Sequence, residues 1–389
     1  MLSKNEILRP VAAPRERIVE LDVLRGLAFL AVVLQHALGV YVRKADIQIS
    51  DAVMLGMLFN FTKFAVPAFV FVTGIVLFYN YYEQLDYPKF IWKRTLEIFL
   101  PYLLWTGIYD LYYHGVPAIN HLWLKAFARN VLFGTGAYHL WFVVMIFQFY
   151  LLYPVLLALF KWVRSWITTQ LRFVGVITLL AALYILLMWF SAGYIAGGHF
   201  QVKAYVLQLL LIKFRDRNFL FFSFYFVLGG IAGVSISKWR DFIIRSVCWN
   251  SMAFVALFVW IGYELMQGLS GGRINLNYST SLKPSMFLYT VSEILLVYGL
   301  SLAIAKSGSR LLGLLDFTGK YSYGAYLVHA LALNYVNKAL TGFVPLANYV
   351  WASTLAFMLC TLLSLGVTGL ISRIPYGKLL IGPFGGRGK

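Results

Sequence analysis

The chain has 389 residues, of which 61% are hydrophobic, 18% are aromatic and only 12% are charged. A soluble globule of this length needs more polar surface than such a composition supplies, so the sequence indicates an all-α polytopic membrane protein. The net charge is +18. Its basic residues are scattered between apolar runs instead of clustered on one face, which argues against nucleic acid as a partner and is typical of membrane topology.

Hydrophobic runs of about 18 to 25 residues predict about ten transmembrane helices in one bundle within a lipid bilayer. They cover residues 18–40, 56–80, 91–112, 140–160, 171–191, 219–237, 244–268, 286–305, 322–340 and 348–371. The segments 121–133 and 199–214 mix basic and apolar residues and are candidates for interfacial helices. With no internal repeat or long linker, residues 1–389 are expected to form a single integral-membrane domain.

Lysine and arginine set the expected orientation. They are more numerous in the two tails and the even-numbered loops than in the odd-numbered loops. By the positive-inside rule, both termini, residues 1–17 and 372–389, are expected to be cytoplasmic tails of a multi-pass protein. The first span lacks the cleavage pattern of a signal peptide, so we expect it to be retained.

The first hydrophobic run carries charge at membrane depth. Arg25 and His36 are eleven residues apart, which places them on one helix face about 16 Å apart along the axis. Asp22 is an i,i+3 partner for Arg25. Ionisable groups at this depth usually mark a site, because burying them costs several kcal/mol. The structural alternative is a salt bridge that fixes helix packing, with His36 as a hydrogen-bonded core histidine.

Five motifs occur in order along the chain. The first is the stretch 17–36, in which ten residues separate Arg25 from His36. The others are FAVPAFVFVTG at 64–74, KRTLEIFLPYLLW at 93–105, HLWFVVMIFQFYLLYP at 139–154 and GKYSYGAYLVHA at 319–330. Together they resemble the membrane acyltransferase 3 family of O-acyltransferases. The resemblance implies transfer of an acetyl or succinyl type of acyl group from a coenzyme A thioester to a hydroxyl of an extracytoplasmic polysaccharide or lipid-linked sugar.

The same resemblance implies a bacterial cell membrane location, acyl-CoA as donor substrate with no permanently bound cofactor, and polysaccharide-synthesis proteins as partners. Three features depart from the family pattern. Thr73 stands where a serine often precedes the glycine, Glu97 stands where many members have a second basic residue after Arg94, and no appended hydrolase-like domain is expected after the last span. The glutamate weakens the expectation of a phosphate clamp at Arg94.

Acyl transfer to a hydroxyl needs a base and a cation. Imidazole takes a proton readily near neutral pH, so His36 is the predicted general base, acting with Arg25 and Asp22. Arginine and lysine hold phosphate, which makes Arg25, Lys63, Lys93 and Arg94 the candidates for binding the anionic donor. The last two lie at the predicted cytoplasmic mouth of the third span.

Further polar and aromatic residues in or beside the spans are weaker candidates for substrate binding. For His139 and Trp141 the alternative is an interfacial aromatic belt, and for Tyr326 and His329 it is helix packing. Gln148 is expected to join helices more than to bind sugar. Glu293 stands alone in the eighth span and needs a cation or proton partner inside the bundle. These six residues complete the predicted site: His139, Trp141, Gln148, Glu293, Tyr326 and His329.

Other patterns carry no function. GLSGG at 268–272 matches a nucleophile motif but lies in a loop without the required strand-to-helix turn. Cys248 and Cys360 have no metal-ligand spacing, and no metal site is predicted. A transporter or flippase exporting a glycan or lipid is the alternative function, because many spans with buried charge also suit a translocation path. Repeat-type transporters have two similar halves, which this sequence lacks.

Overall fold

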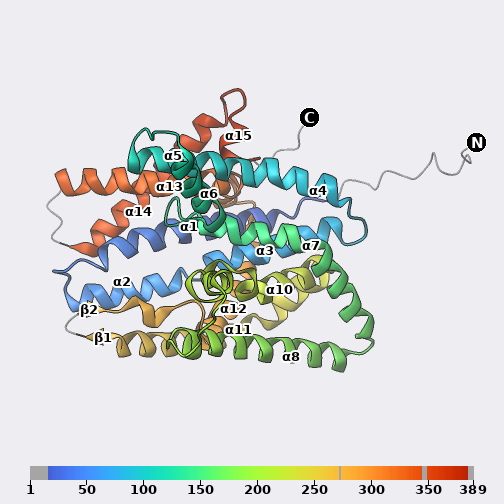
Figure 1. The fold of residues 1–389 in the computed structure, drawn as a ribbon. Coiled ribbons are helices and arrows are strands. Elements are labelled where there is room, and N and C mark those ends of the chain that lie inside the picture. Colours follow the sequence, from blue (N-terminus) through green and yellow to red (C-terminus); the bar gives the residue numbers. More distant parts are fainter. Residues whose placement is uncertain (1–15, 271–272, 344–347, 384–389) are drawn as a thin grey trace, which may run out of the picture.

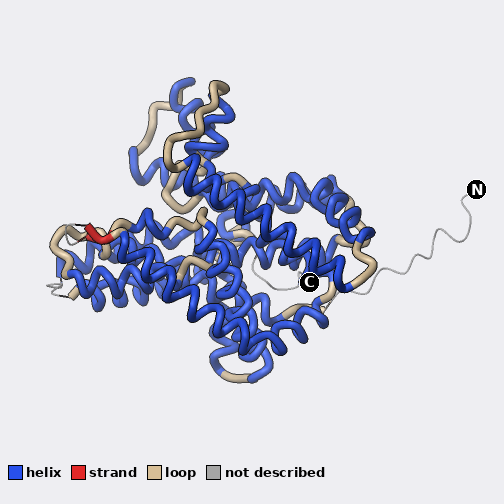
Figure 2. Tube along the Cα trace, turned by 90° about the horizontal axis from the view of Figure 1, so that it is seen from below, coloured by secondary structure: helices blue, strands red, loops and turns tan. Residues whose placement is uncertain are grey.

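The computed structural model describes residues 16–270, 273–343 and 348–383. In this part of the chain almost all regular structure is helical. The exception is a small antiparallel hairpin of β1 (Leu269–Ser270) and β2 (Arg273–Ile274). Figure 1 shows it at the end of the molecule where the first helix ends, and Figure 2 shows it in red at one edge of the molecule. The prediction of an all-α membrane protein is confirmed.

The helices have the following bounds. They are α1 (Val19–Tyr41), α2 (Ile49–Phe61), α3 (Ala65–Tyr81), α4 (Tyr87–Arg94), η1 (Thr95–Phe99), α5 (Leu100–His114), α6 (His121–Phe133), α7 (Trp141–Trp166), α8 (Gln170–Trp189), η2 (Phe190–Ile195), α9 (Tyr205–Gln208), η3 (Leu209–Lys213), η4 (Arg215–Arg217), η5 (Phe219–Phe222), α10 (Ser223–Val234), α11 (Ile236–Gln267), η6 (Leu276–Ser279), α12 (Pro284–Ser307), α13 (Arg310–Phe343), α14 (Tyr349–Ile371) and α15 (Lys378–Ile381).

Seven helical segments of the described residues are long and apolar enough to cross a membrane. They are 19–41, 49–81, 141–166, 170–195, 236–267, 284–307 and 349–371. The predicted number of ten is therefore not confirmed. Of the three other expected spans, 219–237 falls on the short helix α10, 322–340 lies inside α13, and 91–112 runs through α4, the π-helical η1 and α5.

Helix α1 lies at the centre of the bundle and contacts α2, α3, α12, α13 and α14. It approaches α13 closely where two glycines face the other backbone. A Cβ on Gly26 would lie 2.6 Å from the carbonyl oxygen of Leu315, and one on Gly319 would overlap the backbone of Asp22. Small residues allow this approach, as is common between membrane helices. Consequently the side chains of α1 and α13 meet directly.

Ion pairs compensate the charged side chains at the start of α1. The buried carboxylate of Glu20 accepts hydrogen bonds from Arg240 Nε at 2.6 Å and from the Tyr298 hydroxyl at 3.1 Å. Asp22 pairs with Arg25 at 2.8 Å, as the sequence predicted, and with Arg17 at 2.7 Å. These contacts tie the start of α1 to α11 and α12 and compensate the buried charge.

Candidate active site

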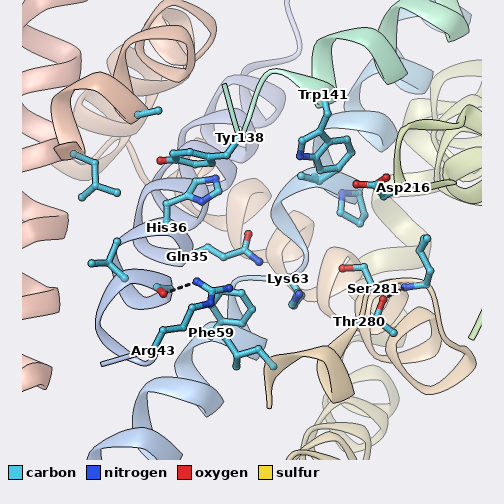
Figure 3. Close-up of a pocket in the computed structure, with 18 of the residues that line it drawn as sticks. Gln35, His36, Arg43, Phe59, Lys63, Tyr138, Trp141, Asp216, Thr280 and Ser281 are labelled. Carbon is cyan, nitrogen blue, oxygen red and sulfur yellow. Dashed lines mark hydrogen bonds between the residues drawn. The ribbon is translucent and has the colours of Figure 1, made fainter. Parts of the chain in front are cut away.

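A cavity of about 1050 Å³ lies beside the C-terminal half of α1. Its wall is built by α1, the α2–α3 region, the start of α7, the segment 212–222 and the C-terminal half of α13. Figure 3 shows His36, Gln35 and Tyr138 on one side, Lys63 and Arg43 below them, and Trp141 with Asp216 opposite. Segments far apart in sequence thus converge on a volume large enough for a substrate.

Three histidines cluster at one side of this cavity. The ring of His36 stacks on that of His329, with centroids 5.2 Å apart and planes 26° apart. His139 meets His329 edge to face at 4.7 Å. Tyr138 contacts His36 edge to face at 4.8 Å. They come from α1, α13 and the loop before α7, so only the tertiary fold brings them together. Of the three histidines only His36 lines the cavity.

The hydrogen bonding of the two inner histidines is incomplete. His329 Nδ1 contacts the carbonyl oxygen of Tyr326, which only accepts, so Nδ1 carries the hydrogen and donates it. His329 Nε2 and both ring nitrogens of His139 are buried without a hydrogen-bond partner among the described residues. The Tyr326 hydroxyl donates to the backbone carbonyl of His139 and so links α13 to the loop before α7. Buried polar atoms without partners are rare in proteins, and three of those among the described residues lie behind His36.

Two further residues of the predicted site, Lys63 and Trp141, line the same cavity. The ammonium of Lys63 lies 4.6 Å from the centroid of the Phe59 ring, a cation–π contact. Within the described ranges, no carboxylate lies at ion-pair distance from Lys63. The structure thus brings together His36, Lys63 and Trp141 at the cavity and places the other two histidines behind them.

Arg25 and Asp22 lie elsewhere. They pair with each other near the start of α1, and neither lines the cavity around His36. Arg94, at the end of α4, lies on the same side as Arg25, since both are within electrostatic range of the Tyr150 hydroxyl. The sequence placed Arg25 and His36 on one helix face, as a cation and a base of one predicted site, whereas in the structure Arg25 does not line the cavity at His36.

The last two residues of α4, both basic, share one carboxylate. Arg94 Nη1 lies 3.0 Å from Glu97, and Lys93 Nζ lies 3.8 Å from the same side chain. The Arg94 guanidinium also packs over the rings of Phe90 and Tyr150 at 5.5 and 5.6 Å. The residue noted as a departure from the family pattern thus neutralises much of the positive charge at this mouth.

Gln148 and Glu293 are not at the cavity. The amide of Gln148 donates to the backbone carbonyl of Arg217 at 2.8 Å and accepts from the backbone of Phe219 at 3.2 Å, so it joins α7 to the segment before α10. Glu293 is buried in α12, and among the described residues no cation pairs with its carboxylate; Tyr289, one turn earlier, is the polar group beside it. The cation partner that the sequence analysis considered for Glu293 is absent from the described part of the chain.

Sequence reasoning missed several polar residues of the cavity wall, among them a tyrosine, two arginines and a carboxylate. Tyr138 directly precedes His139, within reach of the matched motif. Arg43 lies seven residues after His36, in the turn that follows α1. Arg215 and Asp216 lie in the short 3-10 helix η4, in a connection between expected spans whose charges looked like topology signals. Burial raises the pKa of the Asp216 carboxyl, against the opposing effect of Arg217. Among the described residues, no group of three or more His, Cys, Asp or Glu is arranged to hold a metal ion.

Fold and site together define an integral-membrane protein with an imidazole cluster facing a basic internal cavity. Sequence comparison gives the family: the acyltransferase 3 profile, described as an acyltransferase domain, matches residues 18–373. The chain belongs to this family and is a membrane acyltransferase. Comparisons with curated proteins and with solved structures gave no match.

Proposed function

We propose that this protein moves an acetyl or succinyl group from acyl-CoA to a hydroxyl of an extracytoplasmic polysaccharide or lipid-linked sugar, with His36 as general base. The observation that carries the proposal is the position of His36. It belongs to a cluster of three imidazoles and is the one that faces the cavity. A base must reach the proton it removes, so His36 is favoured over His139 and His329.

The neighbours of His36 support this role. No hydrogen bond to its ring is present among the described residues, and the His329 ring on one face and the Tyr138 ring at its edge restrict its orientation instead. A ring held by packing keeps both nitrogens free for substrate and proton transfer. His329 and Tyr138 are therefore proposed as positioning residues.

The proposed reaction balances as follows. His36 accepts the proton of the acceptor hydroxyl while the hydroxyl oxygen attacks the thioester carbonyl carbon. The carbon–sulfur bond of the resulting tetrahedral species then breaks, and the thiolate of coenzyme A leaves with the proton returned by His36. Lys63 supplies positive charge to the same cavity, which favours the oxyanion that develops during this attack.

We place the donor on the cytoplasmic side. Both termini are proposed to be cytoplasmic, so the start of α1, with Arg25, and the end of α4, with Lys93 and Arg94, face the compartment that contains acyl-CoA. Arg25 to His36 spans about 16 Å of helix, which the extended pantetheine arm of coenzyme A is long enough to bridge. The acceptor would then approach His36 from the opposite side.

The test is surface-glycan acylation in cells. A strain lacking the gene is complemented with the wild type, with His36→Ala or with His114→Ala, and the surface glycans are compared by mass spectrometry. Loss of a general base lowers the rate by about 10²- to 10⁴-fold, so His36→Ala should lose the acyl modification. His114, an exposed histidine paired with Asp110 outside the cavity, is the matched control. Wild-type acylation by a well-expressed His36→Ala protein would contradict the proposal.

A further inference from the structure

The cavity wall carries an excess of positive charge. Four cationic side chains line it, from the loop after α1, the α2–α3 junction, η3 and η4: Arg43, Lys63, Lys213 and Arg215. The one carboxylate on the wall, Asp216, has its closest cation in Arg217 at 3.9 Å, which is not a lining residue. In the described ranges none of the four lining cations has a carboxylate within ion-pair distance, and Arg215 Nε is buried without a hydrogen-bond partner.

Three partly buried cations elsewhere are each held by a carboxylate. Lys283, close enough to Lys63 to repel it, is bound by Glu264 at 2.7 Å. Arg240 is bound by Glu20 at 2.6 Å, and Arg94 by Glu97 at 3.0 Å. Like charges that share a partly desolvated cavity repel one another, and a bound anion would compensate this repulsion. The wall around His36 thus carries positive charge that no neighbouring carboxylate balances, which points to an anionic ligand there.

We propose that the acyl acceptor carries an anionic group, a phosphate or a carboxylate, which Arg43, Lys63 and Arg215 bind while its hydroxyl faces His36. This inference rests on the proposed function and adds the substrate class. Arginine binds both groups through paired N–H donors. The phosphates of coenzyme A are a poorer fit, because the donor is placed at the opposite end of α1. Neutral glycans should therefore be weak acceptors.

Binding without acyl-CoA tests the inference directly. The full-length protein in phosphatidylcholine nanodiscs is titrated with three probes of equal tail length: octyl phosphate, octyl β-glucuronide and octyl β-glucoside, with empty nanodiscs as the blank. At least one anionic probe should bind about tenfold or more tightly than the glucoside, since hydrogen bonds to charged groups are strong. The preference should fall in high salt. Preference for octyl phosphate indicates a lipid-linked phosphate, and preference for octyl β-glucuronide indicates an acidic sugar.

Variants separate the cavity charge from general basicity. Lys63→Gln and Arg215→Gln should each weaken the anionic probe by about tenfold, while Lys63→Arg should retain most of its affinity. Lys44→Gln is the matched control, because Lys44 lies beside Arg43 in sequence but does not line the cavity. Retained binding by Lys63→Arg shows that the cavity can be altered without unfolding.

Several results would overturn the inference. One is equal affinity of the wild type for the anionic and neutral probes. Another is that the Gln variants weaken acetyl-CoA binding and leave the binding of the anionic probes unaffected, because the cations would then serve the donor. His36→Ala separates the two proposals. If the wild type prefers the anionic probes but His36→Ala still transfers the acyl group, only the assignment of His36 as the base is wrong. If His36→Ala abolishes transfer but the wild type does not prefer the anionic probes, only the proposed acceptor class is wrong.

Discussion

The close approach of α1 and α13 predicts opposite effects for two glycine-to-alanine substitutions. At Gly319, an added Cβ would overlap backbone atoms of Asp22, which cannot rotate away. Gly319→Ala must therefore separate the two helices, at a cost of about 1–3 kcal/mol for overpacking. Alanine favours a helix over glycine by only about 0.5–1 kcal/mol. The net effect should be destabilisation.

Gly313 is the matched control on the same helix. A Cβ at this position meets nothing within 4 Å. Gly313→Ala therefore gains the helix preference of about 0.5–1 kcal/mol without overpacking and should stabilise the protein or leave it unchanged. The two substitutions are chemically identical and differ only in what the new methyl group meets.

Cys360 reports the outcome. Its thiol is buried and lies 3.4 Å from the backbone carbonyl of His329 on α13, whereas Cys248 is exposed and is replaced by alanine for this assay. A thiol-reactive dye that becomes fluorescent on labelling follows the opening of this region as the temperature rises. Gly319→Ala should lower the labelling midpoint, and Gly313→Ala should not. Equal midpoints for both variants would refute the argument that backbone contact limits the α1–α13 distance.

Three further predictions concern topology, the cavity and the ion pairs. In intact cells, Lys44→Cys should be labelled by a membrane-impermeant maleimide, and Lys93→Cys only after permeabilisation; the reverse pattern would invert the proposed orientation. Because burial raises the pKa of Asp216, this side chain should be protonated before exposed aspartates as the pH falls. The cavity then loses a negative charge, so octyl sulfate, which stays charged throughout, should bind more tightly at lower pH. Asp216→Asn should remove this pH dependence. Arg240→Met should lower stability by about 1–3 kcal/mol, measured by the same thiol assay, because it leaves buried Glu20 with only the Tyr298 hydroxyl.

The features predicted correctly from sequence are the local or compositional ones. Composition indicated the membrane class, and five ordered motifs indicated the family, which the profile match confirms. The Asp22–Arg25 pair depends only on i,i+3 spacing along one helix, and the structure confirms it. The family motifs and the ion pair follow from information held in short stretches of chain, and the membrane class follows from the overall composition.

The features that sequence reasoning did not predict depend on tertiary packing. His36 and His329 belong to helices nearly three hundred residues apart, and no periodicity relates them. Arg43 follows α1 and Arg215 lies in the short helix η4, both between expected spans, where positive charge is already explained by topology. The count of ten spans is not confirmed for a related reason: α13 extends to 34 residues with charged groups in its first half, and a π-helical turn interrupts the helix through Glu97. Hydrophobic run length alone does not distinguish these cases.

Glu97 provides a test of the proposed donor mouth. Its carboxylate is shared by Arg94 at 3.0 Å and Lys93 at 3.8 Å, so it competes with any donor phosphate for both cations. Glu97→Gln should release them and lower the KM for acetyl-CoA by about two- to tenfold, with kcat little changed, because partly exposed ion pairs contribute modest energies.

Initial rates of coenzyme A release in proteoliposomes measure both constants. Glu83→Gln removes an exposed carboxylate that has no ion pair among the described residues and should leave the KM unchanged. A higher KM in Glu97→Gln would mean that the carboxylate holds Arg94 in its binding position, so that Glu97 orients the donor clamp instead of weakening it. An unchanged KM would instead separate Lys93 and Arg94 from the donor path, and Arg25 would then be the cation to examine.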